Sequence, residues 1–372
     1  MASPLEIFSD QMTVFGAAGR YVQGVGIVDR VGPCAAQLGR TALLLSDHVV
    51  LGLLEPQVRR SCDDAGVELR VLGFDGKLGP QTAAAIAAQI DRGWQPASVI
   101  AAGGGRAIDA GKALAHRIGC ALITLPTVAS TDAPTSKNYV LYDDKGMLAE
   151  VCHLPRNPDF VIVDTSILAG APKQMFAAGL GDALSKRAEA RACAGGRGTT
   201  MFMARPTRLG PFIAEKCHET LMLHGARAYD VAGTGRVTQD FDAAVEAMIL
   251  MAGMGFENGG LSVPHALTRG LPLLPGGAKA AHGFQVAYGL VVHHVLLGQR
   301  LPVDLRQLYR HSGLPLSLRE LTGQAVSAEQ VGQVVEATMP VRHMLNFPQD
   351  LTARQLAEAM LSVEADAASG AT

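Results

Sequence analysis

Short apolar segments alternate with longer amphipathic segments in the first half of the chain. The apolar segments are brief, rich in leucine or β-branched residues and bounded by Gly, Pro or Asp: residues 41–46, 68–74, 98–104, 121–126 and 160–165. Amphipathic segments lie between them, for example at residues 51–65 and 81–92. Buried parallel strands read as continuous apolar runs and are joined through helices, so this alternation predicts a parallel sheet covered by helices.

The second half has a different pattern. Residues 138–152 first interrupt the alternation and predict a β-hairpin that turns at Asp144, Lys145 and Gly146. Segments with helical periodicity then follow without strand signals: residues 172–194, 211–226, 239–254, 279–297 and 353–365. The pattern predicts an α/β domain over residues 1–170 and an all-helical domain over residues 171–372, with the ligand site in the cleft between them.

Composition narrows the class of protein. Hydrophobic residues make up 48% of the 372 residues and charged residues 18%, with a net charge of −2 and no dense block of Lys or Arg. These values are typical of a folded globular protein and argue against nucleic acid as a partner. The N-terminal segment lacks a signal-peptide pattern, and no apolar run approaches the about 20 residues that span a bilayer. The six cysteines form no CxxC pair, which predicts reduced thiols, a cytoplasmic protein and nitrogen or oxygen ligands for any metal.

A glycine-rich turn predicts nucleotide binding in the first half. Gly103, Gly104 and Gly105 follow an apolar segment and precede a helical one, where a diphosphate can approach the backbone and the N-terminus of a helix. Asp47 ends the first apolar segment. Its carboxylate would accept the ribose hydroxyls and repel a 2′-phosphate, which favours NAD over NADP. The alternative role of Asp47 is a helix N-cap, and it precedes the glycines, unlike the acidic residue of the usual dinucleotide fingerprint.

Two histidines stand out in the second half. His265 lies within "GFENGGLSVPHALTRGL" and His282 within "AKAAHGFQVAYG", both in mostly apolar surroundings. Each alone is typical of a buried structural histidine. Together they are candidate ligands of one metal ion.

Several motifs carry a family resemblance. They are "YVQG" from Tyr21, "GGGRAIDAGKA", "LPTVASTDAPTS", "NPDFVIVDT", "AGLGDAL", "GFENGGL" and "HG" at His282. In this order the chain resembles the glycerol dehydrogenase branch of the metal-dependent group III, or iron-containing, alcohol dehydrogenases, over roughly residues 10–300.

The resemblance implies a Rossmann-like NAD-binding domain, a C-terminal helical bundle, a divalent metal in the cleft and a homo-oligomer. The metal is expected to be zinc, with Fe²⁺ possible, and its ligands match Asp182, His265 and His282. One carboxylate and two imidazoles leave an open position where the metal can bind an alcohol oxygen and lower its pKa, so that the alkoxide transfers hydride to nicotinamide. Without that context, Asp182 is equally typical of a helix-surface charge paired with Lys186 at i+4.

The resemblance also assigns residues around the cofactor and the substrate. Asp132 matches the aspartate that contacts the substrate hydroxyls, although it also suits a turn before Pro134. The positions expected beside the cofactor, besides Asp47 and the three glycines, are Arg106, Thr127, Ser130, Ser136, Asn138 and Tyr142. The hydroxyl groups among them are also typical of ordinary loop hydrogen bonds. The sequence around Glu189 also resembles the family, but no chemical role is assigned to this residue.

These residues predict an NAD-dependent, zinc-dependent oxidoreductase that acts on a small alcohol or polyol. Lys137, Asn138 and Arg269 depart from the glycerol dehydrogenase pattern. Arg269 follows His265 at i+4, so a shared helical face would place a guanidinium beside the metal and favour an anionic hydroxy acid or its oxo form. Alternatively, Lys137 and Arg269 are structural salt-bridge partners. A lyase resembling dehydroquinate synthase, and a non-catalytic metal- or nucleotide-binding protein, are the other readings of the sequence.

Overall fold

The computed structural model describes residues 5–144 and 146–368, which form two compact units. The first unit comprises Gly16–Lys173 and Val231–Leu250, and the second comprises Leu5–Phe15, Gln174–Asp230 and residues 251–368. In the part of the chain that the structure describes, no helix is long and apolar enough to cross a membrane.

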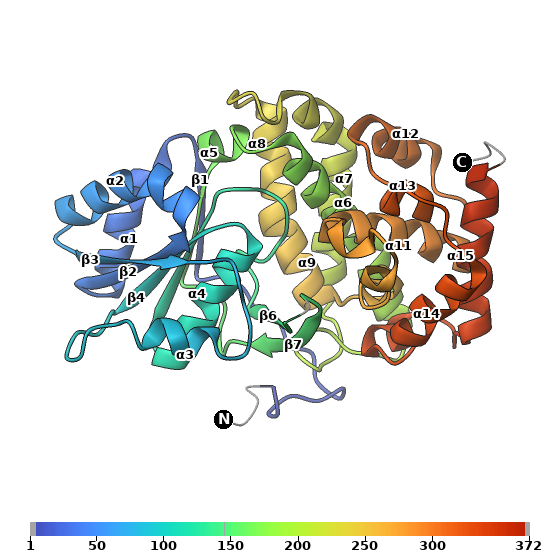
Figure 1. Ribbon diagram of the computed structural model, residues 1–372, viewed down its shortest axis with the longest axis horizontal. Helices are drawn as coiled ribbons and strands as arrows, with labels where there is room; N and C mark the ends of the chain where they lie inside the picture. Colours follow the sequence, from blue (N-terminus) through green and yellow to red (C-terminus); the bar gives the residue numbers. More distant parts are fainter. Residues whose placement is uncertain (1–4, 145, 369–372) are drawn as a thin grey trace. The chain divides into compact units, whose positions relative to one another are not determined.

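A six-stranded parallel sheet forms the centre of the first unit (Figure 1). The strand order is β1-β8-β5-β4-β2-β3. The strands of this sheet are β1 (Arg20–Gly24), β2 (Thr41–Asp47), β3 (Glu68–Phe74), β4 (Ser98–Gly103), β5 (Ala121–Pro126) and β8 (Phe160–Asp164). The five apolar segments of the sequence are β2, β3, β4, β5 and β8, so the predicted parallel sheet is confirmed. The edge strand β1 was not predicted because its side chains are polar or only partly buried.

Helices cover both faces of this sheet, and successive strand residues pack into different layers. Leu44 and Ile100 belong to the core beneath η1 (Ile27–Arg30), α1 (Val31–Leu38) and α2 (His48–Asp64). Leu43 and Val99 belong to the opposite core, beneath α3 (Thr82–Ala87) and α4 (Gly105–Ile118). Side chains alternate between the faces of a strand, so both faces of these strands must be apolar.

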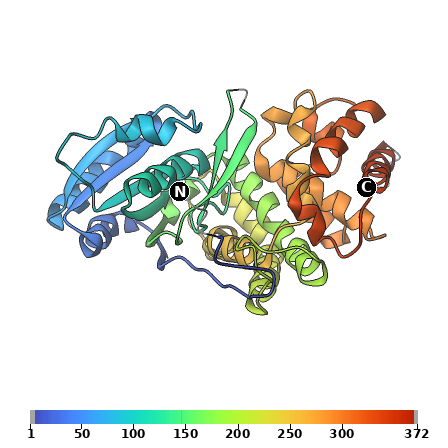
Figure 2. The ribbon, with the colours of Figure 1, turned by 90° about the horizontal axis from the view of Figure 1, so that it is seen from below.

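The predicted hairpin is also present. Strands β6 (Asn138–Tyr142) and β7 (Leu148–His153) pair antiparallel, with a register shift between Leu141 and Tyr142. Figure 2 shows the hairpin as a narrow green ribbon. Of the predicted turn, Lys145 lies outside the described residues. On its inner side, Tyr139 and Leu141 join the same core as α4.

The second unit is helical, as predicted. An isolated β-bridge joins Thr13 and Arg205. The main helices are α6 (Lys173–Gly195), α7 (Leu209–Val231), α9 (Ala252–Gly259), α10 (Val263–Leu267), α11 (His282–Leu296), α12 (Val303–Ser312), α13 (Leu318–Thr322), α14 (Ala328–Thr338) and α15 (Ala353–Ala368). Short 3-10 turns lie between some of them: η3 (Leu271–Leu273), η4 (Gly277–Lys279) and η5 (Arg342–Asn346).

Two helical expectations need correction. The segment 239–254 is not one regular helix, because α8 (Gln239–Glu246) passes through a π-helical turn, η2 (Ala247–Met251), into α9. The segment 279–297 is interrupted after Lys279, so α11 begins only at His282. Helices α12, α13 and α14 were not predicted.

The compact units differ from the predicted division at residue 170 in two segments, the first of which is residues 5–15, which belong to the second unit. Residues 231–250, which carry α8, belong to the first unit. Gln23 Nε2 donates to the Asp242 carbonyl at 2.9 Å, and Thr135 Oγ1 donates to the Ile249 carbonyl at 2.9 Å. Together with α5 (Thr165–Ala169), which packs on α8, these hydrogen bonds attach the segment to the sheet. Such long-range contacts leave no local sequence signal.

Candidate nucleotide and metal sites

The carboxyl ends of β2 and β4 meet where the direction of the sheet reverses. From β2 the chain runs outward to β3 and then returns to β4 on the other side of β2. In open α/β sheets this reversal is where ligands bind, outside the carboxyl ends of the strands. Asp47 ends β2 and Gly103 ends β4. This topology explains why the acidic residue precedes the glycines in the sequence.

Gly103 and Asp47 are close neighbours at this edge. Gly103 has φ of 133°, and a Cβ atom there would lie 2.8 Å from the Cβ of Ala107 and 3.6 Å from Asp47 Oδ2. A side chain at Gly103 would therefore strain the backbone and collide with α4. The helix α4 begins directly after the turn, at Gly105 with Gly104 as its N-cap. The predicted glycine-rich turn between a strand and a helix N-terminus is thus present.

Asp47 has the helix-capping role that the sequence left open. Its Oδ1 accepts hydrogen bonds from the backbone amides of Val49 and Val50, both at 3.0 Å. Both bonds use the same oxygen, whereas Oδ2 is the atom near Gly103. A carboxylate has acceptor positions on both oxygens. Capping by Oδ1 is therefore compatible with a ribose contact by Oδ2, which stays a prediction.

The loop after β5 packs against the glycine turn. The Thr127 amide donates to the Gly103 carbonyl at 3.1 Å. A Cβ atom on Gly105 would lie 3.1 Å from Thr131 Cγ2, so the absence of a side chain permits this close approach. Ser130 lies in the same loop. The structure therefore brings Thr127 and Ser130 to the turn, while their contact with a cofactor stays a prediction.

Lys112 fixes the following segment, and the sequence analysis missed it. Its ammonium group is fully buried and donates to the carbonyls of Ala133 at 2.6 Å and Asn138 at 2.5 Å, and to Ser136 Oγ at 3.3 Å. Asp109 Oδ1 lies 3.6 Å from it. Burial raises the pKa of the Asp109 carboxyl to about 6, although the nearby charge of Lys112 opposes that shift. The available signal was an aspartate and a lysine at i and i+3 among the apolar residues of α4.

Other predicted cofactor positions contact residues of the hairpin formed by β6 and β7. The Arg106 guanidinium lies 5.0 Å from the ring centre of Tyr142, so these two residues do meet. Asn138 Oδ1 lies 2.6 Å from His153 Nδ1 and accepts from Lys137 Nζ at 3.2 Å. Lys137 is therefore held inside the hairpin by its neighbours.

Asp132 is buried in the first unit. Its backbone carbonyl accepts from the Thr135 amide and hydroxyl at 3.3 Å and 3.1 Å, so it has the turn role expected before Pro134. Its side chain is 8% exposed. The role of this carboxyl toward a substrate stays a prediction.

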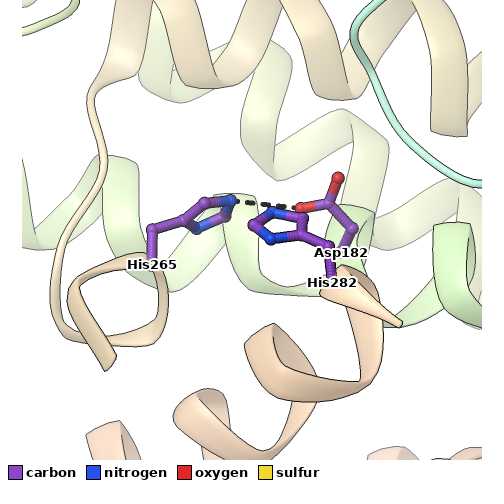
Figure 3. Close-up of side chains that lie close together, drawn as sticks. All are labelled: Asp182, His265 and His282. Carbon is purple, nitrogen blue, oxygen red and sulfur yellow. Dashed lines mark ion pairs between the residues drawn. The ribbon is translucent and has the colours of Figure 1, made fainter. Parts of the chain in front are cut away.

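In the second unit, Asp182, His265 and His282 converge from three different helices (Figure 3). Asp182 lies in the middle of α6, His265 in α10, and His282 is the first residue of α11. Each offers one ligand atom, and these atoms lie within 4.8 Å of one another. Asp182 Oδ1 is 3.2 Å from His265 Nε2, and the two imidazole ring centres are 5.4 Å apart. One oxygen and two nitrogens in this arrangement suit a divalent metal.

Glu189 orients His265, and this role was not predicted. Its Oε2 lies 2.7 Å from His265 Nδ1 and accepts from Ser185 Oγ at 2.9 Å. Its Oε1 accepts from the backbone amides of Ser262 at 2.8 Å and His265 at 3.2 Å. The bond at Nδ1 leaves Nε2 facing Asp182. Such a carboxylate behind a histidine is typical of metal-ligating imidazoles.

The cluster favours positive charge. Burial opposes ionisation of Asp182, but the charge of Lys186 and the hydrogen bond and charge of His265 hold the pKa of its carboxyl well below the usual range. Burial likewise opposes ionisation of Glu189, but His265 and Lys186 lower its pKa to about 2. Burial would lower the pKa of His265, yet Glu189 and Asp182 raise it to about 9. By contrast, desolvation lowers the pKa of the His282 imidazole, and the charges of His265 and Lys186 act in the same direction, although the residue as a whole is exposed. The residues present therefore fit a bound cation.

Two expectations about charges near this cluster are wrong. Asp182 does pair with Lys186, but at 1% exposure it is no helix-surface charge. Arg269 is not in the helix that carries His265. That helix, α10, ends at Leu267, and Arg269 lies in the turn that follows. Its argued position on the ligand face of a helix is therefore incorrect.

This chain belongs to the iron-containing alcohol dehydrogenase family. Residues 18–165 match the family described as "Iron-containing alcohol dehydrogenase". The family resemblance, the oxidoreductase class and the fold class predicted from the sequence are confirmed.

Relatives cover almost the whole chain. Glycolaldehyde reductase from Halobacterium salinarum is 35% identical over 95% of this chain and 97% of its own length. Glycerol dehydrogenase from Escherichia coli is 34% identical over 94% of this chain and 95% of its own length. The crystal structure of glycerol dehydrogenase from Schizosaccharomyces pombe superposes with a TM-score of 0.91 at 29% identity, covering 98% of this chain and 95% of that one.

Proposed function

We propose that this chain catalyses the NAD-dependent oxidation of a small alcohol or polyol, and the reverse reduction of the corresponding carbonyl compound. The observation that carries the proposal is the convergence of Asp182, His265 and His282 in a member of this dehydrogenase family. The names of the relatives, glycolaldehyde reductase and glycerol dehydrogenase, support a small polyol or a hydroxyaldehyde as the substrate class.

The three converging side chains are the proposed metal ligands. Three protein ligands with one open position are typical of catalytic zinc, and iron(II) can use the same nitrogen and oxygen ligands. We propose zinc. When bound, the metal supplies a Lewis acid that polarises the substrate oxygen. Glu189 holds the imidazole of His265 in the orientation that directs Nε2 to this position.

The carboxyl ends of β2 and β4 are the proposed NAD site. The glycine turn and the N-terminus of α4 suit the diphosphate, and Asp47 Oδ2 suits the ribose hydroxyls. Arg106, Thr127, Ser130, Ser136, Asn138 and Tyr142 are the further proposed cofactor contacts. Asp132 is proposed to orient the substrate hydroxyls. A homo-oligomer is also proposed, on the family resemblance alone.

An anionic hydroxy acid is a second candidate substrate. Arg269 is partly buried, and burial lowers the pKa of its guanidinium. Burial lowers the pKa of His343 to about 3, and the charges of Arg342, His265 and Arg269 act in the same direction. The imidazole of His343 thus lies within electrostatic range of both His265 and Arg269. Arg269 lies in the turn directly after the helix that carries His265, and a guanidinium facing the substrate from there would favour an anion.

A substrate screen with zinc-loaded protein tests both candidates. NADH formation is followed by ultraviolet absorbance with glycerol, 1,2-propanediol and ethylene glycol, and with lactate and glycerate as anionic counterparts. Glycolaldehyde and its oxo-acid counterpart glyoxylate test the reverse direction. Sustained NADH formation with neutral polyols is the expected result. Product formation without net NADH would instead indicate a lyase, and no turnover with any compound would support a binding protein.

A further inference from the structure

Lys186 places a positive charge inside the metal-ligand cluster. It follows Asp182 by one turn of α6, and its side chain is 1% exposed. Its Nζ donates to Asp182 Oδ1 at 2.7 Å and lies 3.2 Å from His265 Nε2. The ring centre of Phe256 lies 5.3 Å from the same nitrogen. The ammonium group is therefore held between two metal-ligand candidates and an aromatic face.

The two atoms that Lys186 contacts are those that a metal ion needs. Glu189 occupies Nδ1 of His265, so Nε2 is the nitrogen available to a metal. Asp182 Oδ1 is the carboxylate oxygen nearest that nitrogen, at 3.2 Å. An ammonium ion and a divalent metal cannot both use this pair of atoms at bonding distance. Binding of either cation therefore weakens binding of the other.

Lys186 cannot move far from the ligands. Residues at i and i+4 of a regular helix lie on the same face, so α6 keeps the lysine stem beside Asp182 whatever its rotamer. Asp182 and Lys186 are each 1% exposed, and charges a few ångströms apart interact strongly where the effective dielectric constant is low. A displaced ammonium group would still repel a divalent ion.

We propose that Lys186 is a built-in competitor for the metal, which weakens metal binding and compensates the charge of Asp182 when no metal is bound. The proposal rests on the ligand assignment of the proposed function. The ammonium charge of Lys186 therefore limits the affinity of this site for a metal ion. It also predicts that removing the lysine charge improves metal binding, whereas most substitutions beside a metal site impair it.

The test compares zinc affinity in Lys186→Met and Lys186→Gln with that of the wild-type protein, by equilibrium competition with a chromophoric zinc chelator. Loss of the competing charge should tighten zinc binding at least roughly tenfold. Lys216→Met, an exposed lysine on α7 that pairs with Glu219, is the control and should leave the affinity unchanged. The glutamine variant preserves the comparison if the methionine variant does not fold.

Thermal unfolding gives a second readout. In chelator, Lys186→Met should unfold at a lower temperature than the wild-type protein, because the buried Asp182 carboxylate has lost its counter-charge. With the same excess of zinc the variant should gain more stability than the wild-type protein gains, because the stabilisation by a ligand grows with the logarithm of its concentration divided by Kd.

The outcomes separate the two proposals. If both Lys186 variants bind zinc with wild-type or weaker affinity while His282→Ala loses zinc, the competitor role of Lys186 is wrong and the ligand assignment stands. If His282→Ala binds zinc as tightly as the wild-type protein, the ligand assignment itself is wrong.

Discussion

Lys112 and Lys186 are both fully buried, one in each compact unit, yet their partners differ in kind. The hydrogen bonds of Lys112 go mainly to backbone carbonyls, at Ala133 and Asn138, with Asp109 at 3.6 Å. Lys186 instead donates to the carboxylate of Asp182 and lies beside the imidazole of His265, and both of these side chains are ionisable. The backbone carbonyls at Ala133 and Asn138 belong to the segment that Lys112 holds in place, so loss of these hydrogen bonds would loosen that segment. Side chains that bind cations can exchange one cation for another.

A buried lysine can therefore have either of two roles, and its hydrogen-bond partners indicate which. Lys112 shapes a segment that also carries Asp132 and Ser136, so its contribution is to position a loop. Lys186 contacts the two proposed metal-ligand atoms, Asp182 Oδ1 and His265 Nε2, so its proposed contribution is to metal affinity.

The strongest effect should come from the metal ligands. Asp182→Ala, His265→Ala and His282→Ala should each lose zinc and reduce kcat/KM by more than roughly a hundredfold, because even residues that only orient metal ligands change affinity or activity by 10- to 100-fold. Zinc content is measured by atomic emission and turnover by NADH formation. Treatment of the wild-type enzyme with a chelator should abolish activity, and added zinc should restore it.

A histidine away from the cluster provides the matched control. His311 pairs with Asp230 at 2.7 Å on the surface of the same unit, so His311→Ala should keep zinc and activity. If Asp182 served only as the counter-ion of Lys186, Asp182→Ala would retain stoichiometric zinc, and the comparison between the two lysines would lose its basis.

The second largest effect should be on stability, through Lys112. Lys112→Met leaves the buried Asp109 without its cation and removes donors from two carbonyls. The free energy of unfolding in urea should fall by about 3–5 kcal/mol, the usual cost of breaking a buried ion pair. KM for NAD should rise, since the segment 133–138 is no longer fixed. Zinc affinity should stay unchanged, in contrast to Lys186→Met.

Two variants sharpen this result. Lys77→Met removes an exposed lysine of the same unit and should leave stability unchanged. The double variant Asp109→Asn/Lys112→Met removes both charges and should recover part of the lost stability. A double variant as unstable as the single one would mean that the backbone hydrogen bonds, rather than the ion pair, carry the contribution of Lys112.

The two sites also differ in how far the sequence could predict them. The strands of the sheet follow from local signals, because each is a short apolar run closed by Gly, Pro or Asp. The turn at Gly103 and the carboxylate of Asp47 follow from the same runs, since parallel strands end at one edge. Only the reversal of the sheet between β2 and β4, which sets their order, needed the structure.

The metal cluster has no comparable local signal. Its members come from α6, α10 and α11, and periodicity does not indicate which helices meet. The two histidines stand out in the sequence by themselves, but Asp182, and with it the complete ligand set, was available only through the family resemblance. Lys186 was overlooked because a Lys at i+4 from an Asp is usual on helix surfaces. Burial of both residues depends on the helices packed around α6, which lie far away in the sequence.

A smaller effect should separate the two roles of Asp47. Serine is also a good N-cap, so Asp47→Ser should keep α2 capped and the melting temperature unchanged, while it removes the charge that repels a 2′-phosphate. The ratio of kcat/KM for NAD to that for NADP should fall roughly tenfold, equivalent to about 1.4 kcal/mol. Asp75→Ser, at the end of the neighbouring strand β3, is the control. An unchanged ratio would leave Asp47 as a helix cap only.

The smallest effect should come from Arg269, which tests whether the helical unit selects for charge. Its guanidinium lies in the turn after α10 rather than on the ligand face, and it is only partly buried, so solvent screens its interaction with an anion. Partly exposed ion pairs contribute about 0.2–1 kcal/mol, so Arg269→Asn should shift the preference between lactate and 1,2-propanediol by about fivefold or less toward the neutral diol. The measurement is the ratio of the two kcat/KM values in the variant and in the wild-type enzyme. Arg300→Asn, an exposed arginine of the same unit, controls for a change in net charge. An equal shift in both variants would reflect long-range charge alone. No shift, together with a wild-type preference for neutral polyols, would make Arg269 structural and leave Lys186 as the cation that acts on this site.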